Sequence, residues 1–284
     1  MNRNFLVAVL VAVLCLGMSN AGVARDKKNN ANKSKKIEKV TKRYKTKEEK
    51  YAAALMYYEK GAYLTSAQLL EEIYPLYMSV PQGDTILFLF ADSYMKNNDF
   101  LMAAFHFNDY IRRYPQSNRV ELAAFLAAKC YYLNSPAYNL DQSDSKMAIE
   151  GLQSFISAYP ASEHVEESNA MIDTLRNKLA YKDFSIAKMY YNTENYKAAQ
   201  ICFQNLMKEY PTSNCMEEAL YYMVKNSYAY AQNSIESKKA ERYQMVLDDA
   251  AKLKVYNAES KYMAELDKLM ADAKKKRDKI LNNN

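Results

Sequence analysis

The residue types that usually perform catalysis are few and scattered in this chain. The two histidines, His106 and His164, lie far apart, and neither belongs to a His-Glu-x-x-His or His-x-Glu pattern, so a histidine-based zinc site is not expected. Asp141 and Asp144 are close enough to be considered as paired carboxylates, but they lie in a predicted turn with no base or metal ligand beside them, and solvated capping explains them better. We therefore expect neither a catalytic residue nor a bound metal, and not an enzyme.

Glycine is too rare to build the loops that bind nucleotide phosphates. The chain has 284 residues, of which 49% are hydrophobic, with only 5 Gly and 6 Pro. The glycines fit neither a G-x-G-x-x-G turn nor a G-x-x-x-x-G-K-[ST] loop, so no nucleotide cofactor of these kinds is expected; they are Gly17, Gly22, Gly61, Gly83 and Gly151. So few turn residues also exclude an all-β fold, which leaves a helical chain that is rich in tyrosine.

The first 24 residues have the pattern of an export signal. A charged start at Arg3 is followed by an unbroken apolar run over residues 5–16, which is too short to span a bilayer but fits a secretory signal. Cys15 ends this run, where a bacterial lipoprotein would carry its acylated cysteine, although the bulky Leu14 before it departs from such signals. The sequence leaves open whether Cys15 is lipidated or removed with residues 1–24. An exported chain would keep Cys130, Cys202 and Cys215; burial as small apolar residues is the simpler interpretation, and a Cys202 to Cys215 disulfide is the alternative.

The net charge of +6 comes from one short segment. Residues 25–50 contain twelve Lys or Arg and four acidic residues, whereas residues 51–284 contain 26 basic and 29 acidic residues. The body of the chain is therefore not a nucleic-acid platform. Residues 25–47 lack hydrophobic periodicity and are predicted to be a flexible basic linker, either a soluble spacer or a tether whose lysines lie against anionic lipid.

A repeat begins at about residue 48. The tetrapeptide Tyr-Pro-x-Ser occurs at residues 114–117, 159–162 and 210–213, and an alanine stands twelve residues before each of these prolines, followed four residues later by a bulky apolar residue. These alanines are Ala103, Ala148 and Ala199. The spacing is that of tetratricopeptide repeats, in which a small residue lets two antiparallel helices approach and proline ends the second helix. The serine two places after each proline is expected to cap the next helix.

We expect residues 48–284 to form an all-α tetratricopeptide-repeat superhelix of about five helix pairs. A weaker first copy has its proline displaced to Pro75, a worn fifth copy covers residues 216–262, and residues 265–281 form a closing helix. An insertion rich in turn residues lies at 134–145, and the long spacing from Pro160 to Tyr190 predicts an extended first helix in the fourth repeat.

The third repeat and its insertion resemble one family closely. Tyr131 to Pro136, Leu140 to Ser143, Ala148-Ile149 and the closure at Tyr159-Pro160 are similar to the third-repeat signature of the BamD family, outer-membrane lipoproteins of the β-barrel assembly machinery. The resemblance covers about residues 48–262. It implies a non-enzymatic scaffold on the periplasmic face of the outer membrane, which binds the POTRA region of a BamA-like barrel protein and unfolded outer-membrane proteins. A lipid on Cys15 or the basic linker would give peripheral membrane association. The alternative is a periplasmic adaptor of cell-wall or Tol-type envelope machinery, which shares the Tyr-Pro-x-Ser closures.

Tyrosine and phenylalanine on the first helix of each pair are the candidate binding residues. In a helical-repeat superhelix the first helices line the concave face, where side chains not used in packing are free to meet a peptide, and tyrosine offers both an apolar face and a hydroxyl. The resemblance implies that the first two repeats receive the client's C-terminal signal, which ends in an aromatic residue. The predicted groove residues are Tyr51, Tyr58, Phe88, Asp92, Met95, Phe125, Tyr132, Phe184 and Tyr191.

Overall fold

The computed structural model describes residues 37–282, and within this range every regular element is an α-helix. These residues fall into two compact units, 37–130 and 131–282, with the boundary inside helix α6 (Val120–Asn134). The all-α fold class is confirmed. The predicted export signal, Cys15 and the first part of the predicted linker lie outside the described residues.

The last part of the predicted linker is more ordered than its composition indicates. Residues 37–41 are helical, and the side chain of Ile37 is only 6% exposed. Ile37 and Val40 line a hollow together with Tyr57 and Leu64 of the first helix pair. Two apolar residues three positions apart lie on one helical face, and here this short face is enough to hold the segment against the repeats.

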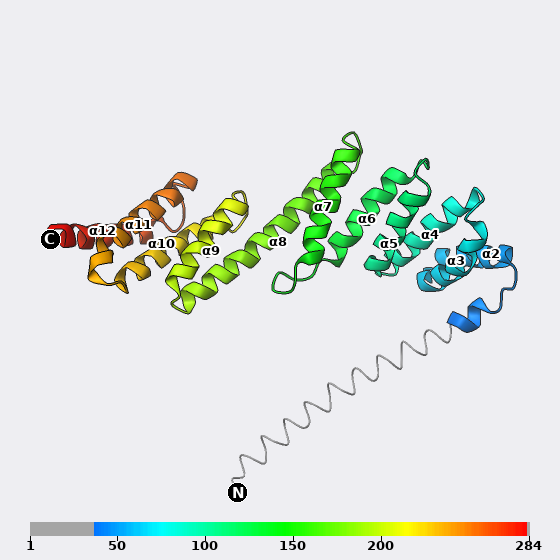
Figure 1. Ribbon diagram of the computed structural model, residues 1–284, viewed down its shortest axis with the longest axis horizontal. Coiled ribbons are helices and arrows are strands. Elements are labelled where there is room, and N and C mark those ends of the chain that lie inside the picture. The colour runs from blue at the N-terminus through cyan, green and yellow to red at the C-terminus, as the bar shows by residue number, and fades with distance from the viewer. Residues whose placement is uncertain (1–36, 283–284) are drawn as a thin grey trace, which may run out of the picture. The chain divides into compact units, whose positions relative to one another are not determined.

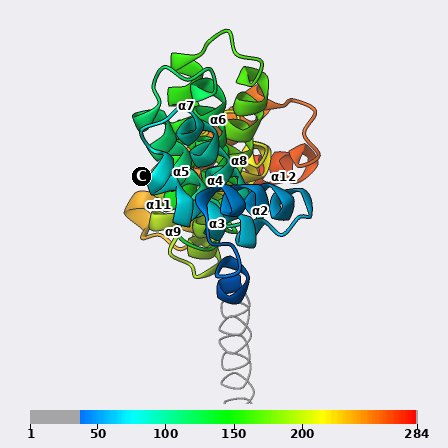
Figure 2. The same cartoon turned by 90° about the vertical axis from the view of Figure 1, so that its right-hand side faces the viewer.

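The first unit is a series of antiparallel helices, and the first four of them pack on one another in chain order. Helix α2 begins with a capping box, in which the Thr46 hydroxyl accepts from the Glu49 amide at 3.1 Å and the Glu49 carboxylate accepts from the Thr46 amide at 3.3 Å. Helices α2 and α3 lie side by side in both ribbon views (Figures 1 and 2). The helices are α2 (Lys47–Glu59), α3 (Tyr63–Tyr77), α4 (Gln82–Lys96) and α5 (Phe100–Arg113), followed by the start of α6.

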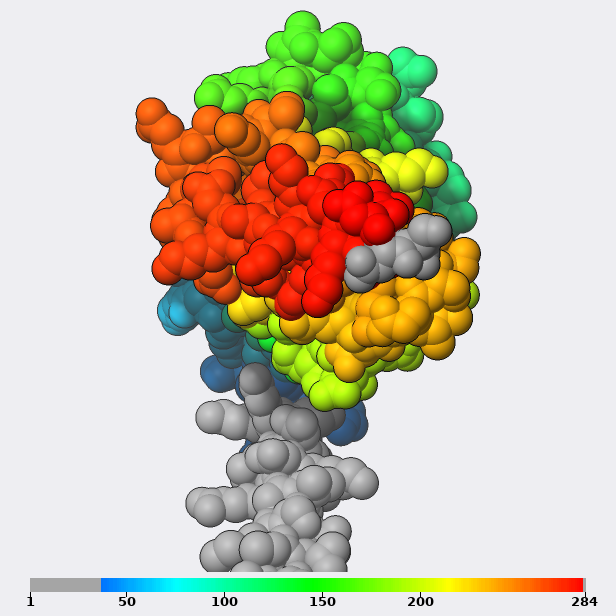
Figure 3. Space-filling view, turned by 90° about the vertical axis from the view of Figure 1, so that its left-hand side faces the viewer, coloured from blue at the N-terminus to red at the C-terminus, as the bar shows by residue number. Residues whose placement is uncertain are grey.

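The second unit is also built from antiparallel helices and ends in the predicted closing helix. Helix α8 has 28 residues, which confirms the predicted extension of the fourth repeat, and α12 occupies the region predicted to close the domain. Figure 3 shows α12 in red beside the orange atoms of α11, on which it packs. The helices are α7 (Ser143–Ala158), α8 (Val165–Asn192), α9 (Tyr196–Glu209), α10 (Met216–Gln232), α11 (Glu236–Tyr256) and α12 (Met263–Asn282).

The small and bulky positions of the repeat are all buried, as the spacing predicted. Ala103, Ala148 and Ala199 lie in the second helices α5, α7 and α9 with no exposed surface. The bulky residues one turn later are equally buried and fill the space beside each alanine; they are Phe107, Leu152 and Phe203. The helix pairs are thus built as in tetratricopeptide repeats.

In three helix pairs, the tight turn between the two helices contains one residue in the left-handed backbone conformation. Gly61, Asn98 and Glu194 have φ angles of 73°, 63° and 61° and occupy the same position, two residues after the first helix ends. Glycine and asparagine tolerate this conformation, whereas glutamate is strained there. The position is therefore defined by the geometry of the turn, and its residue type varies.

Proline and serine act differently from expectation at two places. Pro75 does not end its helix at once, because α3 continues to Tyr77. Its missing N–H removes one hydrogen bond, to the carbonyl four residues earlier, and the helix ends two residues later. The serines of the closures do not cap the next helices, since α8 begins after His164 and α10 after Cys215. Ser162 lies in the preceding turn, where its hydroxyl accepts from the His164 amide at 3.3 Å.

Candidate functional site

Tyr58, Asp92 and Lys96 form a connected cluster on two first helices of the first unit. The Tyr58 hydroxyl, near the end of α2, donates a hydrogen bond to the Asp92 carboxylate on α4. The Lys96 ammonium donates to the Tyr58 hydroxyl, lies 3.3 Å from the Asp92 carboxylate and sits 4.4 Å from the centre of the Tyr58 ring. Tyr63 of α3 meets the Tyr58 ring edge to face at 5.5 Å between ring centres. The cluster thus combines aromatic surface with a cation.

The surroundings of this cluster keep the phenol neutral and the lysine charged. Burial, together with the hydrogen bond to Asp92, raises the pKa of Tyr58. The hydrogen bond to Tyr58 raises the pKa of Lys96. The Lys96 side chain is 44% exposed and that of Asp92 18%. The ammonium is therefore the part of the cluster that a ligand reaches first.

Phe88 forms a second aromatic site on α4, again beside a cation. Its ring meets the rings of Phe107 and Tyr110 edge to face, with centres 5.5 and 5.4 Å apart. The Arg119 guanidinium lies 5.5 Å from the centre of the Phe88 ring and 3.7 Å from the Asp84 carboxylate. Phe88 remains half-buried, so one side of the ring is supported by the core while another part stays accessible.

Tyr51 belongs to the first helix pair and is partly covered by it. Its ring centre is 6.3 Å from that of Tyr77 at the end of α3. The Lys47 ammonium lies 4.8 Å from the centre of the Tyr77 ring. Tyr51 is half-buried, which leaves part of its ring free for a ligand.

A comparable aromatic and cationic cluster occurs in the second unit, on α8 and α10. Tyr222 packs edge to face against both Phe184 and Tyr191, with ring centres 5.9 Å apart in each pair. The Lys188 ammonium lies 4.3 Å from the centre of the Tyr222 ring and 3.3 Å from the Glu218 carboxylate. A hollow of about 310 Å³ opens beside these side chains. Both units therefore place a lysine over a tyrosine of a first helix.

Two predicted groove residues belong to the interior. Phe125 and Phe184 are each only 2% exposed, so neither offers its ring to a peptide, and both are removed from the predicted groove. Both lie on first helices, but the direction of a side chain around a helix depends on which neighbours cover it. The other predicted residues are half-buried or more exposed: Tyr51, Tyr58, Phe88, Asp92, Met95, Tyr132 and Tyr191.

The cations of these clusters were missed by the reasoning from sequence. Lys96 follows Asp92 by four residues, a spacing at which helical side chains meet, and this signal could have been noticed. Its contact with Tyr58, 38 residues earlier in the chain, has no local signal. Arg119 and Lys188 likewise reach aromatic rings on other helices.

The acidic residues and cysteines that were considered for catalysis or a disulfide make contacts within the fold. Asp141 accepts from the Ser143 amide at 2.9 Å, and Asp144 accepts from the Asn134 side chain at 2.7 Å. Cys130, Cys202 and Cys215 are all free thiols, so the disulfide considered for the last two is not formed. Burial raises the pKa of the Cys130 thiol to about 12. Within residues 37–282, no group of three or more His, Cys, Asp or Glu is arranged to hold a metal ion.

The helices are paired, and small and bulky residues are buried where the paired helices meet. This arrangement is that of a tetratricopeptide-repeat protein, with half-buried aromatic residues on its first helices. Residues 43–245 match the family described as "YfiO: Outer membrane lipoprotein". Because this match covers well over half of the chain, the chain belongs to that family. Between residues 37 and 282, none of the helices has the length and apolar character needed to cross a membrane.

Curated relatives carry the name "Outer membrane protein assembly factor BamD". The one from Rickettsia prowazekii is 25% identical over 185 residues, which cover 65% of this chain and 66% of the relative. The one from Caulobacter vibrioides is 27% identical over 115 residues, 40% of this chain and 38% of the relative. The chain thus spans less than two thirds of the length of these two relatives. Among solved structures, the TPR2AB domain of yeast Sti1 in its pHSP90 complex is 12% identical, with a TM-score of 0.36, over 80% of this chain and 98% of that one.

Proposed function

We propose that this chain is a non-enzymatic scaffold of the outer-membrane β-barrel assembly machinery, on the periplasmic face of the outer membrane. It would bind the POTRA region of a BamA-like barrel protein and unfolded outer-membrane proteins. The observation that carries the proposal is the family match over residues 43–245, which agrees with the names of the curated relatives. A lipid on Cys15 or the basic segment 25–47 would attach the chain to the membrane.

The first unit supplies the features that a client segment ending in an aromatic residue would need. Tyr58 and Phe88 each present part of an aromatic ring, and each has a cation beside it, Lys96 or Arg119. A client's terminal aromatic side chain would pack against these rings, and its carboxylate would pair with the nearby cation. Tyr51, Asp92 and Met95 would line the same receiving surface. Tyr132 and Tyr191 are the proposed contacts of the second unit.

Co-purification tests the assignment to the assembly machinery. The chain is tagged at its C-terminus, the cell envelope is solubilised in mild detergent, and the partners are identified by mass spectrometry. We expect a POTRA-bearing outer-membrane barrel protein in stoichiometric yield. Recovery of cell-wall synthases or Tol components without the barrel protein would instead assign the chain to the adaptors of those machines.

Site-specific photocross-linking tests the receiving surface. Benzoylphenylalanine is placed at Tyr58, at Phe88 and, as a control, at Phe105, which is 61% exposed on the second helix α5. The probe is a peptide with the last residues of an outer-membrane protein, ending in phenylalanine, and a second peptide ends in alanine. We expect cross-links from positions 58 and 88 with the first peptide only. Equal labelling at position 105, or equal labelling by both peptides, would refute the assignment of this surface.

A further inference from the structure

The first unit contains a hollow whose wall comes partly from the segment before α2. Residues 37–45, here called the strap, begin with the short helix drawn in blue before α2 in Figure 1. The hollow has a volume of about 470 Å³, and Ile37 and Val40 of the strap line it together with Tyr63 and Leu64 of α3. A segment whose composition predicts a flexible linker thus supplies two side chains to a concave site.

Two buried side chains and a hydrogen bond attach the strap to the first helix pair. Ile37 and Thr41, four positions apart on one face of the short helix, are only 6% and 3% exposed. Burial and a hydrogen bond with Tyr44 raise the pKa of Tyr57, near the end of α2. The strap leads into the start of α2 and also meets its end, so it runs back along this helix. Segments with few buried contacts open at a low cost in free energy, so we expect the strap to detach and reattach.

Lys96 places a positive charge at the edge of the hollow. None of the described residues that line the hollow is charged, but one of them, Asn97, directly follows Lys96 in the chain. The Lys96 ammonium lies 5.8 Å from the centre of the Tyr63 ring, and the Lys96 side chain is 44% exposed. The hollow therefore combines an uncharged, partly aromatic interior with an accessible cation beside it.

An aromatic residue at the C-terminus of a peptide has the matching arrangement of groups. Its ring and its carboxylate are carried by the same Cα atom, so a site that binds both needs an apolar hollow directly beside a cation. Hollows of about 300–1,000 Å³ hold ligand groups of this size, and an ammonium group pairs with a carboxylate. An aromatic residue inside a chain lacks the charge, and a C-terminal alanine lacks the ring, so neither fits both parts of the site.

We propose that the strap and the first helix pair together form the pocket for the terminal aromatic side chain of a client, with Lys96 on its carboxylate, and that the strap closes on the bound client. The inference rests on the proposed function and adds Ile37 and Val40 as binding residues that the repeats do not supply. Tyr63 meets the Tyr58 ring edge to face, so the pocket continues the receiving surface. Because strap and client contact each other, the docking of each strengthens that of the other by the same factor.

Peptide binding to the purified chain tests the strap. Fluorescence anisotropy measures the affinity of three labelled peptides that carry the last residues of an outer-membrane protein. The first ends in phenylalanine with a free carboxylate, the second in phenylalanine with an amidated C-terminus, and the third in alanine. Ile37→Asp detaches the strap, and Lys39→Gln is the matched control, because it changes the charge of the strap by the same amount at an exposed position. Circular dichroism and thermal unfolding check that the repeats of each variant fold.

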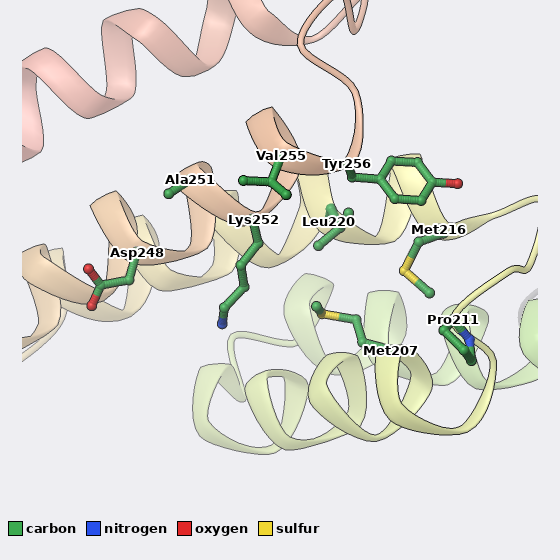
Figure 4. A pocket seen from close by; sticks show the side chains of 9 residues that line it. All are labelled: Met207, Pro211, Met216, Leu220, Asp248, Ala251, Lys252, Val255 and Tyr256. Carbon is green, nitrogen blue, oxygen red and sulfur yellow. The ribbon is translucent and has the colours of Figure 1, made fainter.

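Hydrogen exchange of the unaltered chain measures the same coupling from the side of the strap. The peptide that ends in phenylalanine should slow the exchange of amides in residues 37–45, because the bound client holds the strap in place. The reference is the apolar hollow of about 460 Å³ that α9, α10 and α11 enclose in the second unit (Figure 4), which has a similar volume but is lined by the repeats alone. Exchange in these three helices should not change.

We expect Ile37→Asp to weaken the first peptide by about tenfold, the effect of losing one buried apolar contact, and Lys39→Gln to leave it nearly unchanged. On the unaltered chain, amidation should weaken binding by about fivefold, and the terminal alanine by about tenfold. The proposal is overturned if Ile37→Asp leaves the affinity unchanged or raises it, if the peptide does not slow exchange in the strap, or if it slows exchange equally in α9, α10 and α11. If no peptide binds the unaltered chain, the receiving surface itself is refuted, whereas normal binding by Ile37→Asp refutes only the role of the strap.

Discussion

Replacing Asp249 by alanine should loosen the packing of α9, α10 and α11 in the second unit. Asp249 is 3% exposed on α11, and its carboxylate accepts three hydrogen bonds. The donors are the Gln200 amide of α9 at 3.0 Å, the Ser227 hydroxyl of α10 at 2.5 Å and the Lys252 ammonium at 2.8 Å. One buried carboxylate thus connects three helices that no covalent bond joins at this point.

The size of the effect follows from what each donor does after the carboxylate is removed. Ser227 can donate instead to the side-chain oxygen (Oε1) of Gln200, 3.1 Å away, and Lys252 is 45% exposed and regains water. The Gln200 amide stays buried without an acceptor, at a cost of about 1–3 kcal/mol, and the lost bonds to a charged group cost a similar amount. The free energy of local opening should fall by about 3 kcal/mol, which is roughly a hundredfold in the opening equilibrium.

Hydrogen exchange followed by mass spectrometry measures this opening segment by segment. Peptides from α9, α10 and α11 should exchange roughly a hundredfold faster in the Asp249→Ala variant. Peptides from α3 and α4, in the other compact unit, should be unchanged and serve as an internal reference. Asp248→Ala is the matched control, because Asp248 is exposed on the same helix and accepts only from Gln244.

Two results would refute this reasoning. If Asp249→Ala and Asp248→Ala accelerate exchange equally, the buried network does not hold the helices together. If the acceleration extends to α3 and α4, the two units unfold cooperatively and the effect is not local.

Three further predictions concern single residues in other parts of the repeats. Gly83→Ala should lower the free energy of unfolding by about 2 kcal/mol in urea titrations, because a Cβ atom would lie 2.2 Å from the Tyr77 carbonyl oxygen; an unchanged midpoint would contradict this. Glu194→Gly should raise the free energy of unfolding by about 0.5–1 kcal/mol, because glycine relieves the left-handed strain at φ 61°. Glu194→Ala should not raise it. Burial lowers the pKa of His106 below 6.5 despite the nearby Asp109, so the unfolded state binds the proton more readily and stability should fall as the pH drops below about 6.5; His106→Phe should lose that dependence between pH 7.5 and 5.5.

The repeat architecture could be predicted from local patterns. The Tyr-Pro-x-Ser closures and the alanines twelve residues earlier located the second helices, and the long interval before Tyr190 indicated the extended α8. Such signals work because each helix pair contacts mainly its neighbours in the chain, so short-range spacing carries most of the information about the fold. The prediction that Pro75 ends its helix was wrong. A proline can either end a helix or lie in its last turn, and the residue type alone does not tell which of these two positions it occupies.

The candidate site could be predicted only in outline. The position of Tyr58, Phe88 and Asp92 on first helices predicted that they would be partly exposed, and the structure has them so; their role in binding stays a prediction. The same rule also selected Phe125, which is buried. The cations at Lys96 and Arg119 were not predicted, because their aromatic partners lie on other helices.

The sequence by itself determined that the chain is helical, that its helices pair with small and bulky residues in register, and where most of them end, because helix periodicity, proline and residue size act over a few positions. The tertiary structure decided which aromatic rings remain accessible, which cations lie over them, and that α9, α10 and α11 enclose an apolar hollow. These features depend on side chains that meet across helices, often about 40 residues apart in the chain, and such meetings are set by the packing of whole helices.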